Sequence, residues 1–306
     1  MNQSTPGRVC VVGSVNVDST LRVATLPGPG QTILASGRSV TRGGKGANQA
    51  VAARWHGSDV TLVAAVGDDQ DGLAGLDELR ARGIDVSTVQ LLTDAPTGAA
   101  VVLVADDGEN LIVVDPGANA RLEPGWVRER VARARPHVVV AQLEVPLDCV
   151  HAAAEASTAR YFILNPAPMP PSRAELESLL GQVDVLVPNR PELAQLVGGD
   201  PPVTLDDVDR CAEQLAFAGT LVVTLGGEGA AVYGEQGRRR LTHVPAARVD
   251  ALDTTGAGDA FCGVLADRLA AGVTIVDAVA QATRVAGLST TVRGAQLPSS
   301  VDLPAL

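Results

Sequence analysis

The sequence alternates short apolar runs with segments whose apolar residues recur at helical spacing, and this alternation constrains the fold more than any other feature. Strands separated by amphipathic helices form βαβ units, which place a mostly parallel sheet between two layers of helices. The expected strands are 8–15, 59–66, 137–143, 160–164, 183–187 and 220–225, and the expected helices are 47–55, 72–82, 124–134, 147–159 and 205–218. We therefore expect an α/β three-layer sandwich.

Two segments interrupt this rhythm. Residues 19–42 contain TLPGPGQ and alternating residues but no helical pattern, and residues 97–115 read as two strands around the turn Asp106-Asp107-Gly108. Because both segments are inserted between regular units, we expect them to form a small β-sheet that serves as a lid. The prediction is one domain over residues 1–306 with this lid attached.

Charge and composition exclude several classes of partner. The net charge of −11 disfavours nucleic acid and anionic lipid, no apolar run is long enough to cross a bilayer, and the N-terminus lacks a signal-peptide pattern. The four cysteines are scattered without metal-ligand spacing, which is typical of buried free thiols in a reducing compartment. We expect a cytoplasmic protein that binds neither nucleic acid nor membrane.

The stretch DTTGAGDAF (253–261) contains the clearest chemical signal. Apolar residues at helical spacing follow it up to Gly272, so a helix is expected to begin near Gly256. The free N–H groups of Gly256, Ala257 and Gly258, together with the helix dipole, would favour a bound anion. Asp259 has two interpretations: a first-turn capping carboxylate, or a general base that takes a hydroxyl proton beside a transferring phosphoryl group.

Two common phosphate-binding motifs are absent from the sequence. GAGDAF lacks the third glycine of G-x-G-x-x-G, and GGKG (43–46) lacks both the upstream glycine of a Walker loop and a Ser or Thr after Lys45. A phosphate site in this chain therefore follows another design.

Seven stretches resemble the ribokinase family of carbohydrate kinases, in that family's order and over nearly the whole chain. They are VVGSVNVD (11–18), GGKGANQAVAA (43–53), QLE (142–144), LNPAP (164–168), PNRPE (188–192), TLGGEG (224–229) and DTTGAGDAF. The resemblance implies a ribokinase-like α/β domain with a β lid, and transfer of the ATP γ-phosphate to a sugar hydroxyl. Asp259 would be the base, and the amides of 256–258 would stabilise the phosphoryl group.

The resemblance also implies a sugar site. Its members would be Asn16 and Asp18 at the end of the first strand, Gly43, Gly44, Lys45 and Asn48 from a glycine-rich turn that opens a helix, Glu144, and Asp259. Each of these residues also has an ordinary structural interpretation. Asn16 and Asp18 could be turn residues, and the two glycines could serve close packing. Glu144 could be a solvated loop acid, and Lys45 could be a surface lysine.

The nucleotide and ion sites follow from the same resemblance. ATP would contact Asn189, Thr224, Leu225, Gly226, Gly227, Glu228, Gly229, Gly258 and Asp259; Glu192 would act indirectly on Mg²⁺; and K⁺ would be held near Asp253, Thr255, Ser289, Val292, Gly294 and Ser299. Arg190 departs from the pattern, because the family often carries an acid there. A solvated arginine and a phosphate contact are both compatible with this position.

The scarcity of aromatic residues bears on the substrate. Aromatics make up 2% of the chain and none precedes Trp55, so the two lid segments offer no platform for stacking a nucleobase. We expect a pentose, with D-ribose phosphorylated on its terminal 5-hydroxyl. Deoxyribose, a ketohexose, a nucleoside and a non-catalytic sugar-binding regulator stay open. Apolar residues in 99–104 and 111–114 would let two lids pair, as the family's homodimers do.

Overall fold

The computed structural model describes residues 6–170, 172–234 and 240–298. Its larger sheet has eight strands in the order β14-β13-β12-β11-β10-β9-β1-β4. Neighbouring strands from β4 to β12 run parallel, and β13 and β14 extend the sheet in antiparallel fashion. The bounds are β1 Arg8–Val12, β4 Asp59–Val63, β9 Val138–Ala141, β10 Tyr161–Leu164, β11 Val185–Leu186, β12 Thr220–Thr224, β13 Ala230–Tyr233 and β14 Thr242–Val244.

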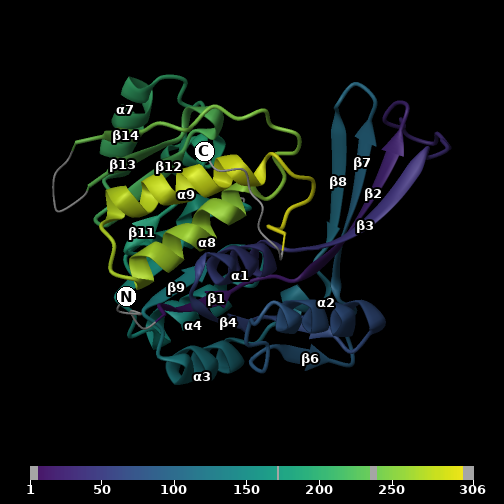
Figure 1. The fold of residues 1–306 in the computed structure, drawn as a ribbon, viewed down its shortest axis with the longest axis horizontal. Coiled ribbons are helices and arrows are strands. Elements are labelled where there is room, and N and C mark those ends of the chain that lie inside the picture. Colours follow the sequence, from purple (N-terminus) through teal and green to yellow (C-terminus); the bar gives the residue numbers. More distant parts are fainter. Residues whose placement is uncertain (1–5, 171, 235–239, 299–306) are drawn as a thin grey trace.

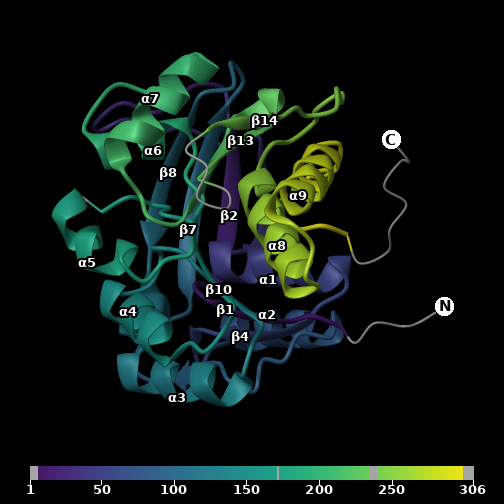
Figure 2. The ribbon, with the colours of Figure 1, turned by 90° about the vertical axis from the view of Figure 1, so that its left-hand side faces the viewer.

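Helices cover both faces of this sheet (Figure 2). One core cluster joins the sheet to α1 (Lys45–His56), α2 (Gln70–Ala81), α8 (Ala257–Ala270) and α9 (Ile275–Ser289). The other cluster lies under α3 (Pro124–Ala134), α4 (Leu147–Ala156), α5 (Glu177–Leu180), α6 (Arg190–Val197) and α7 (Leu205–Leu215). The expected three-layer α/β architecture is confirmed. Within the described residues, no helix is long and apolar enough to cross a membrane.

A second, four-stranded sheet stands at one end of the molecule (Figure 1). We call it the small sheet; its order is β3-β2-β7-β8, with β2 Asn16–Val23, β3 Gly37–Gly43, β7 Gly98–Ala105 and β8 Asn110–Asp115. β2 pairs with β7 in parallel, while the two outer pairs are antiparallel. The turn between β7 and β8 contains Gly108 at φ 90°, as expected for the Asp-Asp-Gly sequence. A further pair joins β5 (Ala65–Gly67) to β6 (Gln90–Leu92).

The structure corrects several expected boundaries. Asn16 and Asp18 do not end the first strand, because β1 stops at Val12 and both residues lie in β2 of the small sheet. The expected strand 59–66 divides into β4 and β5, because the chain after Val63 leaves the large sheet to pair with β6. Helices α4 and α7 are each three residues shorter than expected, and the sequence reasoning missed α6, α9, β13 and β14.

Candidate active site

The predicted helix start in GAGD is confirmed. Gly256 occupies the N-cap position of α8 at φ 75°, and an added Cβ there would collide with the backbone of Ala295. Ala257 is the first helical residue, and no side chain caps this end. The Ala257 amide makes a long bond to Thr254 O at 3.3 Å, and no side chain occupies the amides of this turn, which leaves donors for an anion.

Asp259 lies in the first turn of α8, with only 7% of its surface exposed. Its carboxylate does not cap its own helix. Asn48 Nδ2 donates to Oδ2 at 3.0 Å, and Gln49 Nε2 donates to Oδ1 at 3.1 Å, both from α1. Burial raises the pKa of Asp259, while the charge of Lys45 and the two amide hydrogen bonds oppose that rise. The remaining polar atom of Asn48, Oδ1, is buried without a partner among the described residues, so it can accept a ligand hydroxyl.

A cavity of about 130 Å³ lies at this helix start and collects several predicted residues. Burial by itself would lower the pKa of Lys45, but the charges of Asp259, Glu144 and Glu192 raise it, so the ammonium stays charged. Lys45 is therefore not a surface lysine, because its side chain lines this cavity. The lining consists of Lys45, Asn165, Ala167, Val187, Asn189, Glu192, Thr224, Gly256, Gly258, Asp259 and Cys262.

Asn189 and Glu192 form the capping box of α6. Asn189 Oδ1 accepts from Glu192 N at 2.8 Å, and Glu192 Oε2 accepts from Asn189 N at 2.9 Å. Burial raises the pKa of Glu192. Arg190 is not a free solvated side chain, because its Nη1 pairs with Glu228 Oε1 at 2.9 Å and ties α6 to the TLGGEG turn. That pairing lowers the pKa of Glu228.

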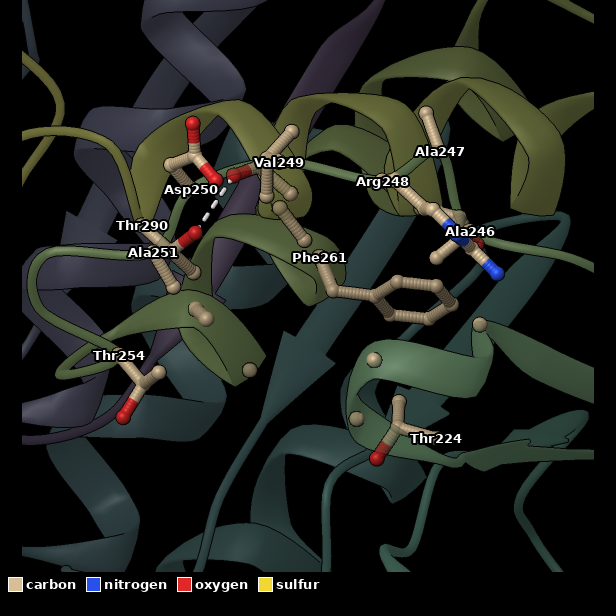
Figure 3. A pocket seen from close by; sticks show the side chains of 18 residues that line it. Thr224, Ala246, Ala247, Arg248, Val249, Asp250, Ala251, Thr254, Phe261 and Thr290 are labelled. Carbon is tan, nitrogen blue, oxygen red and sulfur yellow. Dashed lines mark hydrogen bonds between the residues drawn. The ribbon is translucent and has the colours of Figure 1, made fainter.

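A larger pocket of about 720 Å³ shares Thr224 and Gly258 with the small cavity. Figure 3 shows the ring of Phe261 between the segment that carries Ala246 and Arg248 and the turn that carries Thr224. Of the predicted nucleotide residues, Thr224, Gly226, Gly227, Gly229 and Gly258 line this pocket; the buried Leu225 packs in the core, and Glu228 faces Arg190. Ala257, predicted as one of the anion-binding amides, also lines this pocket. Sequence reasoning missed the remaining lining: Ala246, Ala247, Arg248, Val249, Asp250, Ala251, Thr254, Phe261, Thr283, Ala286, Gly287 and Thr290.

The polar residues next to the small sheet line a third cavity, of about 400 Å³. Asn16 and Glu144 lie on its wall beside Asn119, a residue that no local pattern distinguished. Asn119 is almost fully buried, and its Nδ2 donates to Asn16 Oδ1 at 2.7 Å. Glu144 accepts hydrogen bonds from the Ser14 hydroxyl and from Lys45 N, the latter at 3.0 Å. Glu144 is therefore not a solvated loop acid; it connects the start of α1 to this cavity.

The side chain of Asp18 on β2 lies diagonally against Gly43 on β3, while the partner of Asp18 in the strand register is Thr41. An added Cβ on Gly43 would lie 3.0 Å from Asp18 Cγ and closer still to Oδ2, so the carboxylate occupies the space that a side chain would fill. Burial and the nearby charge of Glu144 raise the pKa of Asp18 to about 6. The neighbouring Gly44 is the N-cap of α1 at φ 89°. Both glycines thus have structural reasons to be glycine.

Asp253 joins two loops near the start of α8. Its Oδ1 accepts from Thr255 N at 3.0 Å and its Oδ2 from Gly294 N at 2.9 Å. Burial alone would raise the pKa of Asp253, but these hydrogen bonds lower it. Ser289 ends α9, Val292 N lies 3.4 Å from the Ser289 carbonyl oxygen, and Asp253 N donates to Thr290 O at 3.0 Å, so the turn after α9 packs against the Asp253 loop. Ser299 lies outside the described residues.

Comparison with known proteins assigns the family. Residues 7–302 match the sequence profile of pfkB family carbohydrate kinases. The chain is 34% identical to a ribokinase of Schizosaccharomyces pombe, covering 96% of both chains, and 35% identical to a deoxyribokinase of Salmonella typhi, covering 94% of both. The structure of Arabidopsis thaliana ribokinase complexed with ribose and ATP superposes with a TM-score of 0.81 at 29% identity, over 98% of this chain and 97% of that one. The chain belongs to the pfkB family of carbohydrate kinases.

Proposed function

We propose that this sugar kinase transfers the γ-phosphoryl group of ATP to the 5-hydroxyl of D-ribose. The observation that carries the proposal is the position of Asp259, which lies at the start of α8 in a cavity that shares Thr224 and Gly258 with the 720 Å³ pocket. ATP would occupy the large pocket, so that its terminal phosphate reaches the amides at 256–258; the Ala257 amide would exchange its 3.3 Å bond to Thr254 O for the phosphate. The sugar would approach from the side of the small sheet.

The reaction proceeds by one in-line transfer. Asp259 accepts the proton of the sugar hydroxyl while that oxygen bonds to the γ-phosphorus and the bond to the β-phosphate oxygen breaks, releasing ADP. The amides of Gly256, Ala257 and Gly258, at the positive end of the helix dipole, stabilise the charge on the phosphoryl oxygens. Lys45 adds a buried positive charge on the same side. Because the transition state is loose, a well-placed carboxylate suffices as base.

The sugar is held by groups on both sides of the 400 Å³ cavity. Asn16 and Glu144 on the cavity wall would pair with hydroxyls. Asp18 on β2 and the unpartnered Oδ1 of Asn48, which do not line this cavity themselves, would accept further hydroxyls of the bound sugar. The same cavity is otherwise lined largely by apolar side chains, among them Val114, Leu143, Val145, Pro146 and Pro168, which suit the carbon face of a small sugar. Closure of the small sheet would exclude water from the reacting groups.

The activities of the relatives, a ribokinase and a deoxyribokinase, favour a pentose. Ribokinases and deoxyribokinases both occur among relatives at about one third identity, so deoxyribose is the principal alternative acceptor. A panel of sugars assayed for kcat/KM decides between them. A preference for deoxyribose over ribose would replace the substrate without changing the reaction.

Two ions fit the donors that are present. Mg²⁺ would bind mainly through phosphate oxygens, with Glu192 and Asn189 on the cavity wall near its water ligands, and it would neutralise charge on the phosphates. K⁺ would suit the Asp253 carboxylate and the carbonyl oxygens of the 289–294 turn, because alkali ions prefer hard oxygen donors. In that turn the carbonyls would come from Ser289, Val292 and Gly294, and a further carbonyl would come from Thr255.

The small sheet is proposed as the dimer interface. All of β8 is exposed, including the consecutive apolar residues Leu111 to Val114. Pairing two small sheets would bury part of these apolar side chains, which point alternately to the two faces of β8, and would cover an open strand edge. The family's homodimers supply the same expectation.

The experiment that tests the proposal replaces Asp259 with asparagine, which keeps the shape but removes the base. In an assay of ADP release with D-ribose, Asp259→Asn should lower kcat by about 10²- to 10⁴-fold while the KM for the sugar changes little. Thermal unfolding and nucleotide binding by the same variant report whether its fold is intact. Wild-type turnover in this variant would eliminate Asp259 as the base, and ADP release that does not depend on sugar would refute the sugar kinase reaction and point to a different acceptor.

A further inference from the structure

Two buried glutamines that the proposed reaction does not use lie beside Asp259. Gln49, on α1, and Gln142, which follows β9, are both fully buried. Gln49 Nε2 donates to Asp259 Oδ1 at 3.1 Å, and Gln142 Nε2 donates to Gln49 Oε1 at 2.6 Å. The three side chains thus form a chain of hydrogen bonds that ends on the carboxylate.

The direction of this chain is determined by its end. An ionised carboxylate can only accept hydrogen bonds, so Gln49 must turn its NH₂ group toward Asp259. Its carbonyl oxygen then needs a donor on the opposite side, and Gln142 supplies one. The NH₂ group of Gln49 also lies 3.4 Å from Asn165 Oδ1, and Asn165 is itself held by Val187 O at 3.0 Å. Gln49 therefore cannot rotate without breaking bonds to three neighbours.

The backbone makes room for these side chains at two glycines. An added Cβ on Gly13 would lie 2.9 Å from Gln142 Cδ and closer still to Oε1, so Gln142 reaches Gln49 only because residue 13 is glycine. An added Cβ on Gly263 of α8 would lie 2.9 Å from the Ala53 nitrogen of α1, so the two helices also meet through a glycine. Buried amides are unfavourable unless they are paired, and apolar residues would fill this space at lower cost.

We propose that Gln49, oriented by Gln142, is a positioning residue that holds the Asp259 carboxylate in its productive geometry. The inference rests on the proposed function, in which Asp259 takes the sugar proton. With Asn48 on Oδ2 and Gln49 on Oδ1, the plane of the carboxylate is fixed from α1, which also carries Lys45. Precise placement of the base matters because the transfer depends on alignment more than on base strength.

The same hydrogen bond affects the ionisation of Asp259. The charged or titratable groups around this carboxylate are Lys45 from α1, Glu144 after β9, Glu192 from α6 and Cys262 from α8. Burial raises the pKa of Asp259, and the Gln49 amide is one of the groups that oppose this rise. Loss of the amide removes part of that opposition, so the active, ionised base would require a higher pH.

The test uses methionine, which is unbranched like glutamine and fills the same space without an amide. Gln49→Met should lower kcat roughly 10- to 100-fold, as expected for loss of a hydrogen bond to a charged group, with little change in the KM for ATP. The acidic limb of the kcat–pH profile should move to higher pH. Gln142→Met should also lower kcat and move the acidic limb to higher pH, but each change should be smaller than in Gln49→Met. The matched control is Gln90→Met, a buried glutamine in β6, which should leave kcat and the profile unchanged.

The outcomes separate this inference from the proposed function. If Gln49→Met keeps the wild-type kcat and pH profile while Asp259→Asn is inactive, the positioning role is refuted and the base remains. If Asp259→Asn keeps wild-type turnover, Asp259 is not the base and the positioning role falls with it; if ADP release by the wild-type protein does not depend on sugar, the proposed function fails whatever the glutamine variants do. Should Gln49→Met not fold, Gln142→Met decides the question, because it leaves every bond to Asp259 in place, and an unshifted profile there overturns the positioning role.

Discussion

Substitution of Gly43 by alanine tests the sugar site with a single methyl group. The new Cβ would lie 3.0 Å from Cγ of Asp18, 3.4 Å from Oδ1 and closer still to Oδ2, which is shorter than carbon–oxygen contact allows. The backbone around Gly43 is paired with β2, so the movable partner is the Asp18 carboxylate. We expect the carboxylate to rotate out of its position while the fold is retained.

The size of the effect follows from what the carboxylate does in the proposed complex. A hydrogen bond to a charged group contributes about 1.5–3 kcal/mol, so loss of one such bond to the sugar should raise its KM roughly 10- to 100-fold. The KM for ATP and kcat should change much less, because Asp259 and the nucleotide pocket are not touched. Alanine also loses less chain entropy on folding than glycine, which offsets part of the strain.

The assay measures ADP release while D-ribose is varied at saturating ATP and at pH 8, where Asp18 is ionised because its pKa is about 6. Thermal unfolding is recorded in parallel. Gly37→Ala, at the opposite end of β3, is the matched control, since an added Cβ there would meet no atom within 4 Å. A Gly43→Ala enzyme with an unchanged KM for the sugar would show that Asp18 is not a sugar ligand.

Three further predictions concern stability and assembly. Asp18→Asn should raise the KM for the sugar and also raise Tm at pH 8, because burial and the charge of Glu144 disfavour the ionised form of Asp18, whose pKa is about 6. The gain in Tm should disappear as the pH falls to 3.8, and an equal gain in Tm at both pH values would contradict this reasoning. Asp267→Asn should lower the free energy of unfolding at pH 7 by about 3 kcal/mol, because it leaves the buried partners of this carboxylate unpaired. Burial alone would raise the pKa of Asp267, but the hydrogen bonds from His56, Ser58 and Arg268 lower that pKa. Urea unfolding should therefore show the difference from wild type fading below pH 3.8. Ile112→Lys should convert a dimer to monomers in size-exclusion chromatography with light scattering, whereas Leu73→Lys on α2 should not; an Ile112→Lys dimer would exclude β8 as the interface.

Much of the fold follows from local sequence. The apolar runs of the expected strands are buried on both sides by helices, so their composition alone indicates parallel strands. The start of α8 is also a local property, because glycine at residue 256 and the helical spacing after it depend only on neighbouring residues. The strand ends were less predictable, since strand length depends on how far the partner strand continues. Residues 59–66 show this, because β5 separates from β4 to pair with a segment far along the chain.

Contacts between residues far apart in the sequence decided what several individual residues do. Asp259 could have capped its own helix, and only the approach of α1 shows that its oxygens are bound by Asn48 and Gln49. Asn119 has no local signal at all; its relation to Asn16 exists because β8 returns the chain to the start of β2. The segment 246–251 carries no periodic pattern, yet it lines the 720 Å³ pocket.

The amino-acid sequence by itself determined the layer architecture, the glycine-rich start of α8 and the order of the candidate motifs, because each depends on residues within a few positions of one another. The tertiary structure decided which side chains share a cavity, which carboxylates are buried and charged, and how Asp259 is oriented. Those properties depend on side chains contributed by α1, α6, α8 and the small sheet, and electrostatic and hydrogen-bond energies depend on distances that the sequence does not contain.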